Sequence, residues 1–189
     1  PRIFAVDDGA TVVDAVDVLR AAASGELETL VGGKRVAVWD PTGGAAAIAV
    51  TEMVAWAVGN GDGPQVRFIT PDANAATMLS LTGDLAGANV RLQQAGVDIV
   101  KRQRLRSVSK DTIETVHAFT GERLELPVDL LIDVAARHPD ESLWTAAGGS
   151  HVRVGDAVAP RTVAEAIREG RAAAMALRSN DDRVTGGAR

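Results

Sequence analysis

The sequence predicts an α/β protein with a parallel sheet, and three consecutive features indicate this class. The segment KRVAVWD (34–40) contains a continuous apolar run, which is typical of a parallel strand covered on both faces. A turn with two glycines (41–44) leads into a helix of small and apolar residues (45–61). QVRFITPD (65–72) is the next predicted strand, and together these elements form a βαβ unit with an expected right-handed crossover.

The segments on either side of this unit are less regular. Residues 1–33 are expected to be a connector that contains one short helix within VVDAVDVLRAAASG (12–25). After the second strand, a helical region that includes Met78 and Leu92 leads to a third short strand, VDIV (97–100). The predicted sheet therefore has three strands by residue 100.

The middle of the chain changes character. LRSVSKD (105–111), TIETVHAF (112–119) and RLELPVD (123–129) alternate apolar and polar residues and are interrupted by a Thr-Gly-Glu turn at 120–122. This pattern predicts a small antiparallel meander. DLLIDVAA (129–136) then returns to the pattern of a buried strand.

The chain is expected to close with a strand in HVRVGD (151–156) and a helix over 160–178. The predicted fold class is a Rossmann-like parallel sheet with helices on both faces, a small antiparallel meander and an incomplete flavin-binding domain at the C-terminus. The predicted domains are a connector (1–33), an NAD(P)-binding-like Rossmann domain (34–148), the closing strand and helix of an FAD- or ADP-binding domain (149–178) and a flexible tail (179–189).

The charge balance excludes some classes of partner. The formal net charge is −5, which is unlike the basic footprint of a general nucleic-acid or anionic-membrane binder. No stretch approaches the roughly 18 apolar residues that span a bilayer, and PRIFAVDDG lacks the features of a signal peptide. We therefore expect a cytoplasmic protein with no nucleic-acid or membrane partner.

The residue inventory is poor for catalysis. Cysteine is absent, which removes disulfides, thiolate nucleophiles and cysteine-ligated zinc or iron-sulfur clusters. The three histidines, His117, His138 and His151, have no companion at metal-ligand spacing. We assign no catalytic residue and no metal site.

The glycine turn after the first buried strand is a candidate dinucleotide site. In the G-x-G-x-x-G fingerprint the glycines allow the turn and the close approach of a pyrophosphate. Here those places are taken by Asp40, Thr42 and Ala45, with Gly43 and Gly44 between them. An anionic Asp40 would repel a pyrophosphate unless it turns to cap the following helix. The residues leave two alternatives open: a dinucleotide site, or a degenerate Rossmann unit with a structural role only.

A second candidate site lies near the end of the chain. If the last helix begins at Pro160, Arg161 lies in its first turn, where the helix dipole disfavours a cation by about 0.3–1 kcal/mol. A bound anion would resolve this conflict, and Asp156, after Gly155, could accept hydrogen bonds from hydroxyls of the same ligand. The alternative is that Gly155-Asp156 is a simple turn and that Arg161 is solvated or pairs with a carboxylate.

These residues also carry a family resemblance. LLIDVAARHPDESLWTAAGG followed by HVRVGDAVAPRTVAEAIREGRAAA resembles the closing segment of the trimethylamine dehydrogenase and 2,4-dienoyl-CoA reductase group of Old Yellow Enzyme-like flavoproteins. TVVDAVDVLRA, KRVAVWD, VRFITPD and VRLQQAGVDIV resemble, in order, the second dinucleotide domain of that group and the crossover into it. The resemblance covers nearly all 189 residues.

The resemblance implies a cofactor and its contacts. Gly155 and Asp156 would face the ribityl or ribose part of FAD or ADP. The residues beside the phosphates would be Ala157, Pro160, Arg161 and Thr162. NAD(P)H is a further candidate ligand, for the turn formed by Asp40, Thr42, Gly43 and Gly44, although the degenerate glycines resemble the amine dehydrogenase side of the group, where this domain is not thought to receive NADPH.

Other parts of such enzymes have no counterpart in this sequence. The group holds FMN in a TIM barrel, carries a cysteine-ligated iron-sulfur cluster and has a first flavin-domain segment with its own glycine loop. The implied function is therefore the nucleotide-binding portion of a multicofactor flavin oxidoreductase, with the upstream barrel and flavin-domain segment as partners, in the same polypeptide or a separate subunit. Without that segment, residues 150–178 are expected to expose an apolar edge.

Two alternatives compete with this interpretation. One is a non-catalytic adenine-nucleotide-binding or scaffold module in which Asp40, Thr42, Gly43 and Gly44 are structural. The other is a self-sufficient NAD(P)-dependent reductase, which would need a substrate pocket and a proton donor that the sequence does not reveal.

Overall fold

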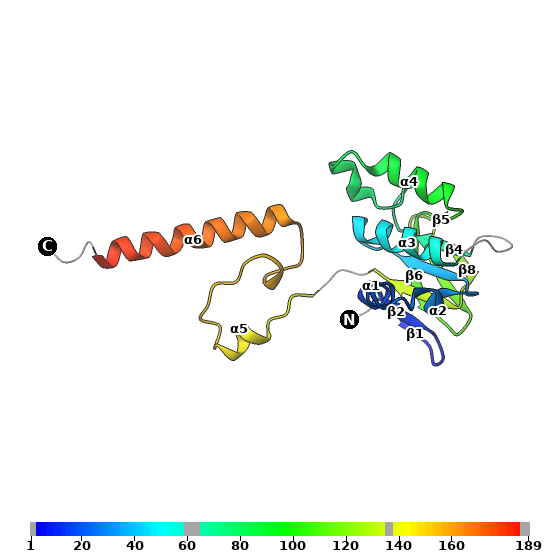
Figure 1. Ribbon diagram of the computed structural model, residues 1–189, viewed down its shortest axis with the longest axis horizontal. Coiled ribbons are helices and arrows are strands. Elements are labelled where there is room, and N and C mark those ends of the chain that lie inside the picture. The colour runs from blue at the N-terminus through cyan, green and yellow to red at the C-terminus, as the bar shows by residue number, and fades with distance from the viewer. Residues whose placement is uncertain (1–2, 59–64, 135–137, 186–189) are drawn as a thin grey trace. The chain divides into compact units, whose positions relative to one another are not determined.

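The computed structural model describes residues 3–58, 65–134 and 138–185, with side chains up to Leu177 in the last helix. The chain divides into two compact units, Pro1–Ala135 and Ala136–Arg189 (Figure 1). The α/β class predicted from the sequence is confirmed. The division differs from the predicted boundaries, which placed residues 1–33 outside the first domain and residues 138–148 within it.

A five-stranded parallel sheet is the centre of the first unit. Its order is β2-β9-β3-β4-β5, and every neighbouring pair is parallel. The strands are β2 (Val12–Asp14), β3 (Val36–Trp39), β4 (Val66–Ile69), β5 (Asp98–Val100) and β9 (Leu130–Asp133). All residues of β3 and β9 are buried, as the continuous apolar runs predicted.

A smaller sheet has the order β1-β6-β7-β8. Its strands are β1 (Ala5–Val6), β6 (Gln103–Val108), β7 (Thr112–His117) and β8 (Arg123–Pro127). Strands β6, β7 and β8 form the predicted antiparallel meander, and β1 pairs with β6 in parallel. Gly121 in the turn between β7 and β8 has a φ of 74°, the left-handed conformation that glycine adopts most readily.

The two faces of the parallel sheet are covered differently. The helices α1 (Ala15–Ser24), α2 (Leu27–Val31), α3 (Ala45–Val58) and α4 (Leu85–Gln94) pack with Val36, Val38 and Phe68 in one core cluster. The alternate residues Ala37, Trp39 and Ile69 pack instead against Phe4, Leu105 and Ile113 near and within the small sheet. Helices on both faces were expected. In the described part of the unit one face carries helices and the other the antiparallel sheet, because each meander strand has its own apolar side.

The connector predicted over residues 1–33 contributes to this core. Its strands β1 and β2 extend the two sheets, and Val18 and Val31 are fully buried. A capping box starts α1: Asp14 Oδ1 accepts the Asp17 amide at 2.9 Å, and Asp17 Oδ2 accepts the Asp14 amide at 3.2 Å. Strands of two and three residues carry too little pattern to be recognised from sequence.

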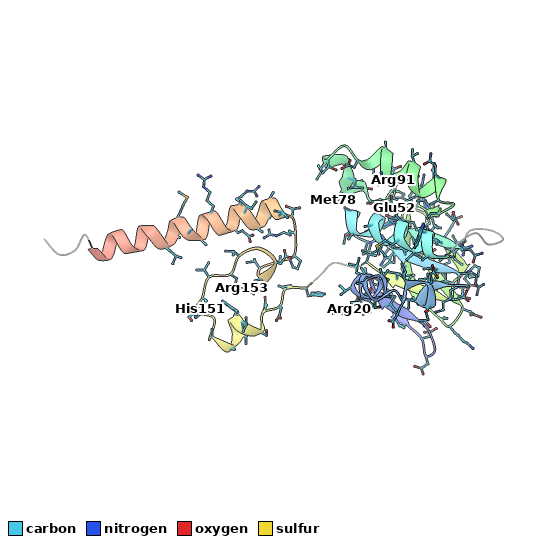
Figure 2. The ribbon with its side chains drawn as sticks, viewed as in Figure 1. Arg20, Glu52, Met78, Arg91, His151 and Arg153 are labelled. Carbon is cyan, nitrogen blue, oxygen red and sulfur yellow. The ribbon has the colours of Figure 1, made fainter. Side chains whose placement is uncertain are left out.

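Helices α3 and α4 are joined by an ion pair in which Glu52 Oε1 and Arg91 Nε lie 2.7 Å apart (Figure 2).

Between β4 and α4 the chain forms a short 3₁₀ helix, η1 (Thr77–Leu81). Only the later part of the helical region predicted after the second strand is therefore α-helical.

The second unit contains α5 (Ser142–Ala146), a 3₁₀ turn η2 (Gly155–Ala157) and α6 (Val163–Thr185). The strand predicted at 151–156 does not form a ladder within residues 138–185, although Val154 is extended with φ −143° and ψ 155°. An extended segment becomes a strand only beside a partner strand. The last helix begins at Val163 instead of residue 160 and continues through seven residues, 179–185, of the segment predicted to be a tail.

Candidate functional site

The first predicted site lies at the carboxyl end of β3. From β3 the chain continues to β4 on one side, whereas β9 later pairs on the other side, so the strand order reverses beside β3. In open α/β sheets ligands bind outside the carboxyl ends of the strands at such a reversal. Asp40 directly follows β3, and its amide donates to Ile69 O at 3.0 Å, which continues the pairing with β4.

The Asp40 side chain turns back into the glycine turn. Its Oδ1 accepts the amide of Thr42 at 3.1 Å, the Thr42 hydroxyl at 3.1 Å and the amide of Gly43 at 2.9 Å. The residue is fully buried. The carboxyl group therefore accepts the hydrogen bonds of the turn before α3, as expected if Asp40 caps the helix and the turn has only a structural role.

Two opposing effects act on the acidity of Asp40. Burial raises its pKa, and the amides of Thr42 and Gly43, which stabilise the anion, lower it again; the net shift is upward. The second oxygen, Oδ2, is buried and has no hydrogen-bond partner among the residues described. Such an oxygen is costly to bury as an anion, which is consistent with the direction of the shift.

The segment after β4 covers the same turn. Gly43 has a φ of 71°, and its carbonyl accepts the Met78 amide at 2.9 Å. A Cβ on Gly43 would lie 3.1 Å from Asp72 Oδ2 and 3.3 Å from the Thr77 amide nitrogen. Gly43 is therefore needed for close packing of the turn against residues 72–78, the segment that carries the labelled Met78 (Figure 2).

The second predicted site centres on Gly155 in η2. Gly155 is buried with a φ of 61°, and a Cβ there would lie 3.1 Å from Ala166 Cβ on α6. Its amide donates to Glu169 Oε2 at 2.7 Å. These contacts bring Gly155, Asp156 and Ala157 against the first turns of α6, with Asp156 and Ala157 exposed to solvent.

Arg161 does not lie in the first turn of the helix. Thr162 precedes Val163 and its Oγ1 accepts the Glu165 amide at 3.3 Å, as an N-cap residue does. The Arg161 guanidinium forms an ion pair with Glu169 Oε1, and its Nε donates to Ala159 O at 3.3 Å. The expectation that Arg161 lies in the first turn, against the helix dipole, is therefore wrong. Arg161 precedes the N-cap residue and pairs with a carboxylate of the protein.

Two residues of the second unit were not recognised from the sequence. Glu169 holds both the Gly155 amide and Arg161, and only its spacing of eight residues from Arg161 could have indicated this. Arg153, labelled in Figure 2, lies over the Trp144 ring at 4.3 Å from its centroid and donates to Ala157 O at 3.3 Å. Arg153 thus braces the loop that leads into η2.

Within residues 3–58, 65–134 and 138–185 no group of three histidine, aspartate or glutamate side chains could hold a metal ion. In the same described ranges, no helix combines the length and the apolar character that crossing a membrane requires.

No protein-family model matches the sequence, and no curated protein matches it. Solved structures do. Histamine dehydrogenase from Rhizobium sp. 4-9 matches with a TM-score of 0.75 and 26% identity over 86% of this chain and 25% of that chain. The 6-hydroxypseudooxynicotine amine oxidase HisD from Pseudomonas geniculata N1 gives a TM-score of 0.72 and 20% identity over 86% of this chain and 24% of that chain. Thioredoxin reductase from T. acidophilum gives a TM-score of 0.59 and 14% identity over 93% of this chain and 59% of that chain.

The fold occurs in flavoprotein oxidoreductases. A further match is named a flavoprotein, the disulfide reductase RclA from Escherichia coli, with a TM-score of 0.55 and 16% identity over 82% of this chain and 31% of that chain. The chain spans about a quarter of the length of histamine dehydrogenase and of HisD. The likeness therefore concerns a module of these oxidoreductases.

Proposed function

We propose that this chain is the FAD- or ADP-binding portion of a multicofactor flavin-dependent oxidoreductase of the trimethylamine dehydrogenase and 2,4-dienoyl-CoA reductase group. The likeness to histamine dehydrogenase over 86% of the chain supports the group, and the 25% coverage of that protein supports the role of a portion. The substrate chemistry, the FMN barrel and the iron-sulfur cluster belong to other parts of the enzyme. A bound FAD would accept and pass on electrons.

The observation that carries this proposal is the packing of Gly155 on α6. Only glycine fits at position 155, where φ is positive and a Cβ would lie 3.1 Å from Ala166 Cβ, so η2 packs closely against the start of α6. Asp156, exposed beside it, would accept hydrogen bonds from ribityl or ribose hydroxyls. The residues near the phosphates would be Ala157, Pro160, Arg161 and Thr162.

The apolar face of α6 supports the need for a partner segment. Val163, Ile167 and Leu177 are 77%, 67% and 64% exposed, and Val152 before η2 is 67% exposed. An apolar stripe of this size is normally covered in a folded protein. The upstream flavin-domain segment would supply the missing strands beside Val154 and cover this stripe.

The test compares FAD binding by the 189-residue chain with binding by the chain extended at its N-terminus with the sequence encoded upstream. We expect weak or absent binding by the former and stoichiometric binding by the latter. Gly155→Ala in the extended chain should lower FAD affinity at least tenfold, because the added methyl group meets Ala166. Gly170→Ala on α6 is the matched control, since a Cβ there meets nothing within 4 Å. Tight stoichiometric binding of FAD by the 189 residues alone would contradict the proposal.

The scaffold alternative also has an observation in its favour. The chain's own carboxylates already accept the amides of Gly43 and Gly155 in the two predicted sites. Calorimetric titration of the extended chain with ADP, FAD, NADH and NADPH separates the possibilities. FAD binding favours the flavoprotein portion, ADP binding alone or no binding favours the scaffold, and saturation by NADPH at micromolar concentration favours a reductase.

A further inference from the structure

We propose that Asp40 excludes dinucleotides from the first unit, because its carboxylate occupies the amide groups of the turn that would otherwise bind a pyrophosphate. This inference concerns the first unit and goes beyond the proposed function, which rests on the second. It assigns Asp40 a role as a specificity-determining residue.

The location of Asp40 gives the first argument. A strand followed by a glycine turn and a 14-residue helix, α3, directs free amides toward one point at the strand reversal beside β3. A pyrophosphate bound in such a fold accepts hydrogen bonds from those amides. In this chain the amides of Thr42 and Gly43 donate instead to Asp40 Oδ1, at 3.1 and 2.9 Å.

The burial of Asp40 gives the second argument. The side chain is fully enclosed, and its Oδ2 has no hydrogen-bond partner in the part of the chain that is described. A phosphate group at this point would have to displace the carboxyl group from the turn, or approach it with like charge in a low-dielectric setting. Both are unfavourable, so the residue acts by occupancy and by charge together.

The neighbouring carboxylate of Asp72 provides a control, because its removal tests whether any loss of negative charge near the turn permits dinucleotide binding. Asp72 Oδ2 lies 3.1 Å from the position of a Cβ on Gly43, but the amides of Thr42 and Gly43 donate to Asp40. Removing Asp72 therefore changes the charge by the same amount and leaves the amides of Thr42 and Gly43 bound to Asp40.

The test measures NADPH and inorganic pyrophosphate binding to the full 189-residue chain and its variants by calorimetry, after circular dichroism has confirmed folding. We expect no saturation of the wild type or Asp72→Ala at 1 mM ligand (an order-of-magnitude threshold for weak phosphate sites), and at least tenfold tighter binding by Asp40→Gly. Asp40→Asn, whose amide oxygen can still accept the Thr42 and Gly43 amides although its charge is lost, should bind less tightly than Asp40→Gly. Equal binding by folded Asp40→Gly and wild type, or equal gains in Asp40→Gly and Asp72→Ala, would overturn the proposal.

A measurement on the wild type keeps the proposal testable if Asp40→Gly does not fold. The amide signals of Thr42 and Gly43 are followed by NMR while pyrophosphate is added. No change in these two signals is the expected result. A saturable shift of both signals would show that pyrophosphate reaches the turn with Asp40 in place, and would refute the exclusion.

Discussion

Glu169 accepts the amide of Gly155 through Oε2 at 2.7 Å and the guanidinium of Arg161 through Oε1. One carboxylate on α6 thus links the turn η2 to the residue that precedes the helix cap. These contacts join two residues of the proposed nucleotide site, Gly155 and Arg161, although the sequence did not mark Glu169.

Replacing Glu169 by Ala should loosen η2. The Gly155 amide is buried, and loss of a charged acceptor leaves it unsatisfied at a cost of about 1–3 kcal/mol. Hydrogen exchange of the Gly155 amide should become at least tenfold faster, as measured by NMR at pH 7. Glu165→Ala is the control, because Glu165 pairs with the exposed Arg168 and its side chain does not accept the Gly155 amide. An unchanged exchange rate in Glu169→Ala would contradict the assignment.

The contact of Arg35 with Asp129 should make the stability of the first unit depend on pH. Asp129 Oδ2 accepts hydrogen bonds from the backbone amide of Arg35 at 2.8 Å and from Arg35 Nε at 2.9 Å. The hydrogen bonds from the Arg35 guanidinium lower the pKa of Asp129 from 3.8 to about 2. A lowered pKa means that the stabilisation is complete above the unfolded-state value and disappears as the pH falls through about 2. After discounting for solvent, since both side chains are over a third exposed, the contribution is about 1 kcal/mol.

Urea unfolding of Asp129→Asn and of the wild type should therefore differ by about 1 kcal/mol at pH 7 and converge toward pH 2. Asp98→Asn provides the comparison, because Asp98 Oδ2 lies 3.5 Å from Arg67 Nε, a looser ion pair for which we expect a smaller effect. A difference for Asp129→Asn that does not change with pH would exclude the charge interaction as its cause.

Val18→Ala tests whether the N-terminal segment belongs to the core. Val18 on α1 is fully buried, so removal of two methyl groups should cost about 2 kcal/mol in the free energy of unfolding. Leu19→Ala, at a neighbouring position that is 43% exposed, should cost less than about 1 kcal/mol even though it removes more atoms. Equal effects in chemical denaturation would favour a connector that packs loosely.

Ile167→Asp tests the apolar face of α6. Because Ile167 is 67% exposed, the melting temperature of the 189-residue chain should remain within a few degrees of the wild type. The same change in the chain extended upstream should reduce FAD binding at least tenfold, since the charge would be buried beneath the covering segment. Ala172→Asp, on the opposite side of the helix by its spacing, should leave binding intact. Unimpaired binding by the extended Ile167→Asp chain would refute the proposed covering of the stripe.

The sequence by itself determined the class of the fold and the central strands. Four consecutive apolar residues in β3 and three in β9 indicate burial on both faces of a parallel sheet, and the alternation in β7 indicates a half-buried antiparallel strand. These patterns are local, because side-chain direction repeats every two residues in a strand. Gly155 was also recognised locally, from its place before Asp156 and the last helix.

Only the tertiary structure decided which strands pair with the short N-terminal strands and which groups bind the side chains of Asp40 and Arg161. The short strands of residues 5–14 depend on ladders with β6 and β9, about 100 residues away, and no pattern of two or three residues can announce such a partner. The direction of the Asp40 carboxyl group and the pairing of Arg161 with Glu169 are likewise set by contacts in space. From the sequence, Asp40 could either repel a pyrophosphate or cap the following helix, and Arg161 could meet a bound anion, solvent or a carboxylate of the protein. In both cases the fold supplies groups of the protein itself, because a charge is stabilised by whichever complementary group lies within hydrogen-bond distance.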